Sequence, residues 1–131
     1  MSPSEPTLLI VEDEADIREL LGTELKMEGF HVETAENGRV ALDAMERRRF
    51  DLVITDLKMP VVGGLAVLAQ AKRVNPPIPV IVATGWASAG SADVCRASGA
   101  EVVLLKPFDL DEMIGNVKRL LNARSVAPQV S

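Results

Sequence analysis

Five short apolar or alternating segments recur along the chain, and each is followed by a stretch with helical periodicity. Four of them are nearly continuous hydrophobic runs, as is typical of strands in a parallel sheet that helices cover on both faces. The second, "HVET", alternates apolar and polar residues and is expected at an edge. Because connections between parallel strands are right-handed crossovers, the alternation predicts a doubly wound open α/β sheet. The predicted strands are Leu8–Val11, His31–Thr34, Leu52–Thr55, Val80–Ala83 and Val102–Leu105.

The segments between the strands carry apolar residues at helical spacing and end in capping signals. Asn37 is a candidate N-cap of the second helix, and Gly29 is expected to close the first. The fourth segment is short and only weakly amphipathic, so we expect it to be the least firmly held. Helices are expected within residues 13–29, 37–48, 63–75, 91–99 and 109–123.

Length, charge and cysteine content limit the class of protein. A chain of 131 residues is long enough for one domain, and its formal charge of -5 argues against a sequence-independent grip on nucleic acid. A single cysteine, Cys95, and a single histidine, His31, cannot supply a disulfide or the usual zinc ligands. No apolar run is long enough for a membrane span and no signal peptide is present, so we expect a cytoplasmic protein. We expect a disordered N-terminus over residues 1–6, a domain over residues 7–124 and a tail over residues 125–131.

Polar residues stop four of the predicted strands at their carboxyl ends. The first strand stops at Glu12 and Asp13, and the third stops at Asp56. The fourth stops at Thr84, and the fifth stops at Lys106. Since all carboxyl ends of a parallel sheet lie at one edge, where open α/β proteins bind ligands, these side chains should converge there.

An unbroken acidic triplet, Glu12–Glu14, follows directly on an apolar strand. Burial and mutual repulsion penalise such charges unless the strand ends in water or a cation lies beside them. Together with Asp56, the acidic pair would share a cleft with one lysine, and hard oxygen ligands of this kind suit Mg²⁺. Magnesium beside a carboxylate and a lysine favours phosphoryl transfer. Asp56 is then the candidate nucleophile, with Lys106 offsetting charge on the phosphoryl group and Thr84 donating to another of its oxygens.

Taken singly, each of these residues has an ordinary structural explanation. Acidic residues at Glu12–Glu14 suit the start of a helix through its dipole. Asp56 alone could be a loop residue, and Thr84 or Lys106 alone would be an ordinary surface residue. Their combination at the ends of neighbouring strands is what favours a site.

The chain also holds reactive or charged residues for which we expect structural roles. Cys95 is expected to be a small packing residue, and His31 a structural residue far from the cleft. Trp86 is interpreted as a solvent-edge aromatic residue, with a role in gating the site as the alternative. The run "ERRR", residues 46–49, is expected to be a solvated helix end.

Four motifs, "VEDE", "DLVITDLKMPVVGG", "ATGWAS" and "LLKPF", occur in an order and at separations that resemble the receiver domain of two-component response regulators. The resemblance extends from Thr7 to about Arg124. It implies the flavodoxin-like, CheY-like fold, with five parallel strands in the order 2-1-3-4-5 and five flanking helices. It also implies that Asp56 accepts a phosphoryl group from a histidine kinase.

The resemblance assigns the remaining site residues as well. Mg²⁺ would be bound by Glu12, Asp13, Asp56 and the backbone carbonyl of Lys58. Thr84 would swing toward the phosphoryl group and Lys106 would form an ion pair with it. Pro107 would follow that lysine, joined to it by a cis peptide bond.

The sequence departs from the family at the switch position. Receivers usually carry an aromatic residue three positions before the lysine, and Val103 stands there. Signal output through the rotation of a ring is therefore not expected, although the Thr84 half of the switch is present. Two bulky residues, Lys58 and Trp86, occupy positions that tune the lifetime of the phosphoryl group in the family, and we expect them to restrict the access of water.

Three functions follow from these residues, and the leading one is a switch controlled by phosphorylation of Asp56. It would alter the surface around the fourth and fifth predicted helices for a downstream protein target. The expected donor is a histidine kinase or phosphotransfer protein, and the chain is expected to be a monomer or a weak phosphorylation-dependent homodimer. We expect no direct binding of nucleic acid or membrane, and no enzymatic activity beyond its own phosphorylation and dephosphorylation.

The second hypothesis is a Mg²⁺-dependent phosphatase with an aspartyl nucleophile. Such an enzyme needs a second carboxylate two residues after the nucleophile, where this chain has Lys58. The third is an unphosphorylated docking module that keeps only the fold, and the intact set of acidic residues, Thr84 and Lys106 argues against it.

Overall fold

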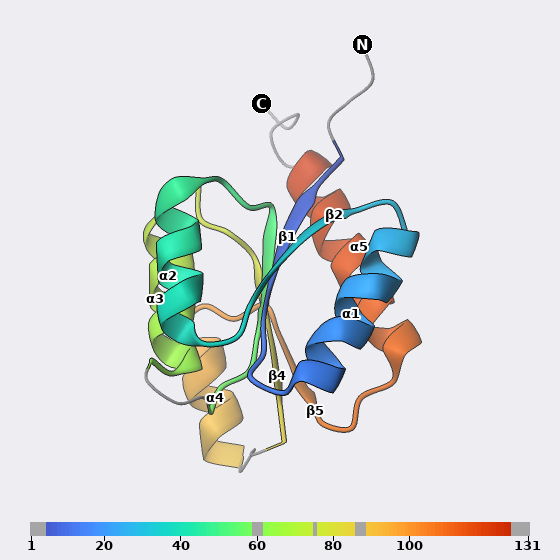
Figure 1. The fold of residues 1–131 in the computed structure, drawn as a ribbon. Coiled ribbons are helices and arrows are strands. Elements are labelled where there is room, and N and C mark those ends of the chain that lie inside the picture. Colours follow the sequence, from blue (N-terminus) through green and yellow to red (C-terminus); the bar gives the residue numbers. More distant parts are fainter. Residues whose placement is uncertain (1–4, 59–61, 75, 86–88, 127–131) are drawn as a thin grey trace.

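In the computed structural model of the protein, five parallel strands form one sheet in the order β2-β1-β3-β4-β5 (Figure 1). The structure describes residues 5–58, 62–74, 76–85 and 89–126, apart from the side chains of residues 89, 90 and 124–126. All four pairings are parallel. The predicted doubly wound sheet and the strand order implied by the family are both confirmed. The strands are β1 (Thr7–Val11), β2 (His31–Ala35), β3 (Leu52–Thr55), β4 (Val80–Thr84) and β5 (Val102–Leu105).

Helices cover both faces of the sheet, with α1 and α5 on one side and α2, α3 and α4 on the other (Figure 1). Their side chains form two separate apolar cores, because successive residues of a strand point to opposite faces. In β1, Leu9 and Val11 belong to the core under α2, α3 and α4, whereas Leu8 and Ile10 belong to the core under α1 and α5. The helices are α1 (Ala15–Met27), α2 (Gly38–Arg47), α3 (Gly64–Arg73), α4 (Ala89–Ala97) and α5 (Leu110–Val126).

The capping residues expected from the sequence lie at the ends of their helices. The Asn37 side chain accepts a hydrogen bond of 2.9 Å from the Val40 N–H and so caps α2. Gly29 follows α1 with a φ of 100°, a conformation that favours glycine. The Phe30 N–H there donates to the Leu25 carbonyl, which ends the helix as in a Schellman motif.

Helix α5 is longer than predicted and ends at Val126 instead of Ala123. The apolar periodicity stops at Leu121, which is why the sequence suggested an earlier end. Once a helix has formed, each added residue gains a hydrogen bond, so a helix can extend beyond its last apolar residue. The first two residues of the predicted tail, residues 125 and 126, are therefore helical.

Several structural roles expected from the sequence are confirmed. Cys95 of α4 is fully buried in the core, and burial raises the pKa of its thiol despite the nearby charge of Arg96. His31 lies at the start of β2, where its Nε2 is 3.2 Å from the Glu5 carboxylate, far along the sheet from the carboxyl edge. Strand β2 is an edge strand, as its alternation predicted. No helix in the described part of the chain is both long and apolar enough to cross a bilayer.

Candidate metal and phosphoryl site

The ends of four strands bring polar side chains to the carboxyl edge of the sheet. Glu12 and Asp13 follow β1, and Asp56 follows β3. Thr84 is the last residue of β4, and Lys106 follows β5. Hydrogen bonds continue from the sheet into this edge, because the Asp56 N–H donates to the Val11 carbonyl at 3.1 Å and the Lys106 N–H donates to the Thr84 carbonyl at 2.9 Å.

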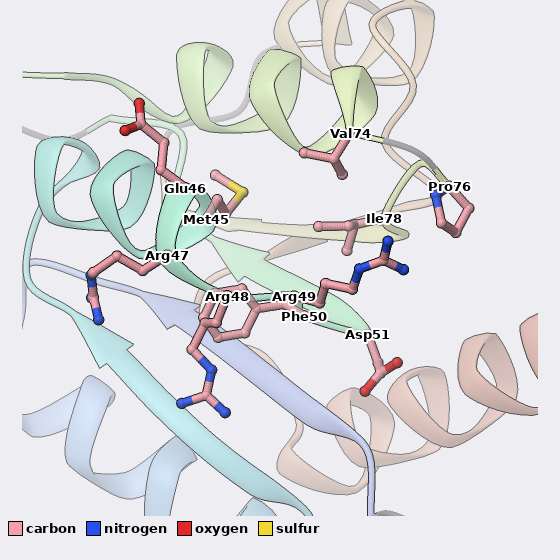
Figure 2. A pocket seen from close by; sticks show the side chains of 10 residues that line it. All are labelled: Met45, Glu46, Arg47, Arg48, Arg49, Phe50, Asp51, Val74, Pro76 and Ile78. Atoms are coloured by element: carbon pink, nitrogen blue, oxygen red, sulfur yellow. The ribbon is translucent and has the colours of Figure 1, made fainter.

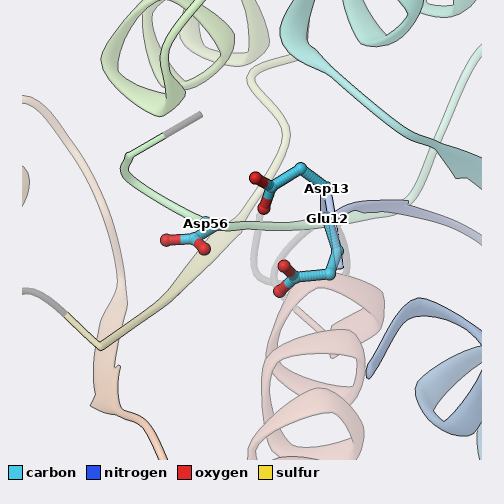
Figure 3. Close-up of side chains that lie close together, drawn as sticks. All are labelled: Glu12, Asp13 and Asp56. Atoms are coloured by element: carbon cyan, nitrogen blue, oxygen red, sulfur yellow. The ribbon is translucent and has the colours of Figure 1, made fainter. Parts of the chain in front are cut away.

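Three carboxylates meet at this edge, as Figure 3 shows for Glu12, Asp13 and Asp56. One oxygen of each lies within 4.8 Å of an oxygen of the others. Glu12 and Asp56 are only 3% and 7% exposed, while Asp13 is exposed to solvent. A cluster of like charges at this depth is unfavourable unless cations neutralise it.

The ammonium of Lys106 lies between two of these carboxylates. Its Nζ is 2.7 Å from Glu12 Oε1 and 2.8 Å from Asp56 Oδ2, and the exposed Glu14 carboxylate is 3.7 Å away. Burial alone would lower the pKa of Lys106, but hydrogen bonds and charges of Asp56 and Glu12 raise it above its ordinary 10.5. Burial raises the pKa of Glu12 above its ordinary 4.5, although Lys106 and the Glu14 N–H act in the opposite direction.

The Asp56 carboxylate is held by the chain that follows it. Its Oδ1 accepts hydrogen bonds from the Leu57 N–H at 2.6 Å and from the Lys58 N–H at 3.3 Å. Its Oδ2 accepts from Lys106. The carboxylate is therefore fixed in orientation on both oxygens, and the backbone of Lys58 lies next to it. That the Lys58 carbonyl binds a metal stays a prediction.

Two residues that help to build this edge carried no predicted role. Arg18 of α1 donates to the Glu12 carbonyl at 2.8 Å and so holds the loop that carries the acidic pair. Gly64 packs against the backbone of Asp56, where an added Cβ would lie 2.9 Å from the Asp56 carbonyl carbon and closer still to its oxygen. The repeated glycine in "VVGG" was the available signal for Gly64, but neither contact follows from sequence spacing alone.

The residues predicted for the switch differ in how far the structure describes them. Thr84 is buried at the end of β4, at 1% exposure. Val103 is partly buried and packs against the core under α2, α3 and α4. The bond between Lys106 and Pro107 is cis, as the family implied. Trp86 lies outside the described residues, and the roles of all these residues stay predictions.

A hollow of about 410 Å³ lies at the opposite end of the sheet (Figure 2). It is lined by Phe50 and Asp51, which come just before β3, and by Ile78, which comes just before β4. None of the predicted site residues lines it. The chemistry expected from the sequence is therefore located at the carboxyl edge, away from this hollow.

An open parallel sheet with an acidic cluster and a largely enclosed lysine at its carboxyl edge defines the class of CheY-like α/β proteins. The family model described as the response regulator receiver domain matches residues 8–118. The chain belongs to this family of two-component systems, in which phosphorylation and Mg²⁺ binding are typical.

Curated relatives are longer than this chain. Regulatory protein AtoC of Escherichia coli is 34% identical over 94% of this chain, which corresponds to 27% of AtoC. Transcriptional regulatory protein PrrA of Mycobacterium tuberculosis is 34% identical over 91% of this chain and 51% of PrrA. The chain thus spans between about a quarter and a half of the relatives that it matches.

Solved structures agree with the fold over most of the chain. A CheY-like response regulator receiver domain protein from Methanospirillum hungatei superposes with a TM-score of 0.89 at 28% identity, covering 93% of this chain and 98% of that one. The response regulator TrrA of Thermotoga maritima, in complex with Mg²⁺ and BeF, gives a TM-score of 0.78 at 36% identity. This match covers 88% of the present chain and 98% of TrrA.

Proposed function

We propose that this receiver domain is a phosphoacceptor, in which Asp56 takes a phosphoryl group from the phosphohistidine of a histidine kinase or phosphotransfer protein. The observation that carries the proposal is the meeting of Glu12, Asp13 and Asp56 within 4.8 Å beside the ammonium of Lys106, whose side chain is only 12% exposed. Receiver domains are generally not enzymes in the ordinary sense, and here too the acceptor is the protein itself.

The donor set suits magnesium. Carboxylate oxygens are the hard ligands that Mg²⁺ prefers, and an exposed Asp13 leaves one side of the cluster open to water and to a phosphoryl group. The proposed ligands are Glu12, Asp13, Asp56 and the Lys58 carbonyl. When bound, the cation would neutralise charge on the transferring oxygens. The complex of TrrA with Mg²⁺ and BeF supports this choice by analogy.

The side chains would act on a balanced transfer. A carboxylate oxygen of Asp56 forms a bond to phosphorus while the bond from phosphorus to the histidine nitrogen breaks, and that nitrogen keeps the electron pair. The Leu57 and Lys58 N–H groups hold the carboxylate in place, so little reorganisation is needed. Lys106, already beside Asp56 Oδ2, would offset the charge of the phosphoryl oxygens.

The phosphorylated form would differ from the free form in two contacts. Lys106 would exchange part of its bonding to the carboxylates for the phosphoryl group, and the Thr84 hydroxyl would turn toward it. Because only such differential contacts can shift a two-state equilibrium, we propose that they alter the surface around α4 and α5 for a protein partner. Val103 lacks a ring, so this output would proceed through Thr84 alone. We further propose that the domain works in the cytoplasm as a monomer or weak homodimer, without binding nucleic acid itself.

The test is labelling with acetyl phosphate and Mg²⁺, followed by mass spectrometry of the intact protein. We expect one added phosphoryl group that is labile to hydroxylamine, and none in Asp56→Asn. Asp43→Asn is the matched control, because Asp43 is an exposed aspartate of α2 that pairs with Arg39 on the same helix, away from the acidic cluster. Undiminished labelling of Asp56→Asn would refute the assignment.

A turnover assay with a phosphomonoester distinguishes the receiver from the phosphatase hypothesis. An aspartyl phosphatase would turn over a phosphomonoester continuously. A receiver accepts one phosphoryl group on its aspartate, and that phosphoryl group is then hydrolysed slowly. The exposed Lys58 at the position of the second carboxylate favours the receiver. Sustained release of phosphate from p-nitrophenyl phosphate that depends on Asp56 would favour the phosphatase instead.

A further inference from the structure

Gly38, the first residue of α2, lies directly against the backbone of Val62 in the connection between β3 and α3. A Cβ added at Gly38 would lie 2.7 Å from Val62 Cβ and 2.8 Å from the Val62 carbonyl carbon, and closer still to its oxygen. The glycines with positive φ in the described part of the chain are Gly29 and Gly99, so Gly38 is not required by its backbone conformation. It is required by space, and any side chain there must displace the Val62 backbone.

Val62 lies in the same connection as the predicted metal ligand Lys58. That connection is closed by a hydrogen bond of 2.9 Å from the Gly64 N–H to the Leu57 carbonyl. Leu57 and Lys58 in turn hold Asp56 Oδ1 through their N–H groups. A displacement of Val62 would therefore be transmitted to the backbone that orients Asp56.

The turn that contains Gly38 also contacts the other acidic loop. The Glu12 N–H donates to the carbonyl of Ala35, the last residue of β2, at 3.0 Å. Two residues later Asn37 caps α2 and fixes where the helix begins. Residues 35–38, the β2–α2 turn, thus touch the loop of Glu12 at one end and the loop of Lys58 at the other.

We propose that the β2–α2 turn positions the two loops that would bind the metal at a fixed spacing, and that Gly38 is its positioning residue. The proposal deepens the proposed function and rests on it for the identity of the metal. Gly38 touches neither the metal ligands nor the phosphoryl group, so it acts through Val62. Residues that act through a ligand commonly change metal affinity by about 10-fold or more when substituted, and we expect about a 10-fold rise in the Mg²⁺ dissociation constant of Gly38→Ala.

The experiment is a titration of ¹⁵N-labelled protein with MgCl₂, followed by NMR. Gly22→Ala and Gly115→Ala are matched controls, because a Cβ at Gly22 meets nothing closer than 3.8 Å and one at Gly115 meets nothing within 4 Å. We expect weaker Mg²⁺ binding in Gly38→Ala only. An unchanged dissociation constant in this folded variant would overturn the proposal.

A second readout does not depend on magnesium. In the metal-free protein the amide signals of Leu57 and Lys58 should move in Gly38→Ala and stay in place in both controls. If these signals do not move, the positioning role is wrong, whereas a wild type that binds no Mg²⁺ would refute the proposed function instead. Should Gly38→Ala not fold, Asn37→Ala loosens the same turn, and the same two amide signals must move in that variant for the proposal to stand.

Discussion

The amino and carboxyl edges of the sheet differ in the sign and the exposure of their charged side chains. Near the amino edge, Arg47 and Arg48 at the end of α2 share the carboxylate of Glu33, in the middle of β2, and their side chains are 62% and 49% exposed. At the carboxyl edge, three carboxylates converge, and two of them are nearly buried with the one ammonium of Lys106 between them. The first arrangement has one positive charge in excess, which water can solvate, whereas the second keeps an excess of negative charge largely away from water.

This difference indicates that the carboxyl edge, and not the amino edge, is suited to bind a cation. Exposed ion pairs contribute little to stability, and they need no further partner. A buried excess of one sign destabilises the protein unless another cation joins it, so such a cluster persists where binding requires it. The comparison favours a site at the carboxyl edge, although the hollow of about 410 Å³ lies at the amino edge (Figure 2).

The largest effect should come from removing the Lys106 ammonium, which lies against two carboxylates of the acidic cluster. In Lys106→Met, Glu12 and Asp56 lose their buried partner, and we expect about 3 kcal/mol less stability without magnesium. Saturating Mg²⁺ should restore part of this, because the cation supplies the missing positive charge. The labelling rate with acetyl phosphate should fall by about 100-fold, as for the loss of one preorganised donor.

Chemical denaturation with and without MgCl₂ checks the stability, and timed mass spectrometry checks the rate. Lys118→Met is the control, because the Lys118 side chain is 51% exposed and pairs with Glu28 on the surface. An equal loss of stability with and without Mg²⁺ would contradict the expectation that the cation replaces the charge of Lys106.

An intermediate effect should appear in the pH dependence. Because burial raises the pKa of Glu12 in the folded protein, the folded state binds a proton more readily than the unfolded one, where the value is near 4.5. Between 4.5 and the raised pKa, this residue makes the metal-free protein less stable as the pH rises. The same protonation competes with Mg²⁺, so magnesium affinity should fall as the pH is lowered through this window.

Glu12→Gln isolates this contribution, since glutamine keeps the shape and does not titrate. Unfolding curves at a series of pH values should differ in slope between wild type and Glu12→Gln in that window. If the stability of the two proteins changes with pH in parallel, the raised pKa of Glu12 is not the cause of the pH dependence.

The smallest effect should come from the amino edge. Glu33→Gln removes the carboxylate shared by Arg47 and Arg48, and we expect a loss below about 1 kcal/mol, as for other exposed pairs. Magnesium affinity should be unchanged. Thermal unfolding and the MgCl₂ titration check both, and a change in magnesium affinity would contradict the separation of the two edges.

The sequence predicted that the site lies at the carboxyl edge of the sheet, and it predicted most of the polar residues there. The reason is local. Four of the five strands are apolar runs, and the polar residue that ends such a run must lie at the strand's carboxyl end whatever the rest of the chain does. Asp56 and Lys106 were found in this way, although they are 50 positions apart. The apolar run of β5 resembles those of the central strands, so hydrophobicity alone did not identify β5 as the second outer strand of the sheet, opposite β2.

The contacts that hold the site were not predictable in this way. Arg18 reaches back six positions to a carbonyl, and Gly38 and Gly64 are needed because of backbones that only the folded chain brings near them. Composition and the spacing of residues along the chain do not show which backbone segments come close together in the folded protein. The end of α5 was likewise missed, since its last residues carry no apolar periodicity.

By itself, the sequence determined the alternation of strands and helices and the chemical type of the residues at the carboxyl edge. Both of these features depend on the periodicity of hydrophobic residues and on which residues are neighbours along the chain. Only the tertiary structure decided that Lys106 lies within 2.8 Å of two carboxylates and that Gly38 abuts Val62. Distances of this kind are set by how whole elements pack, because a shift of any helix changes them while leaving every local pattern intact.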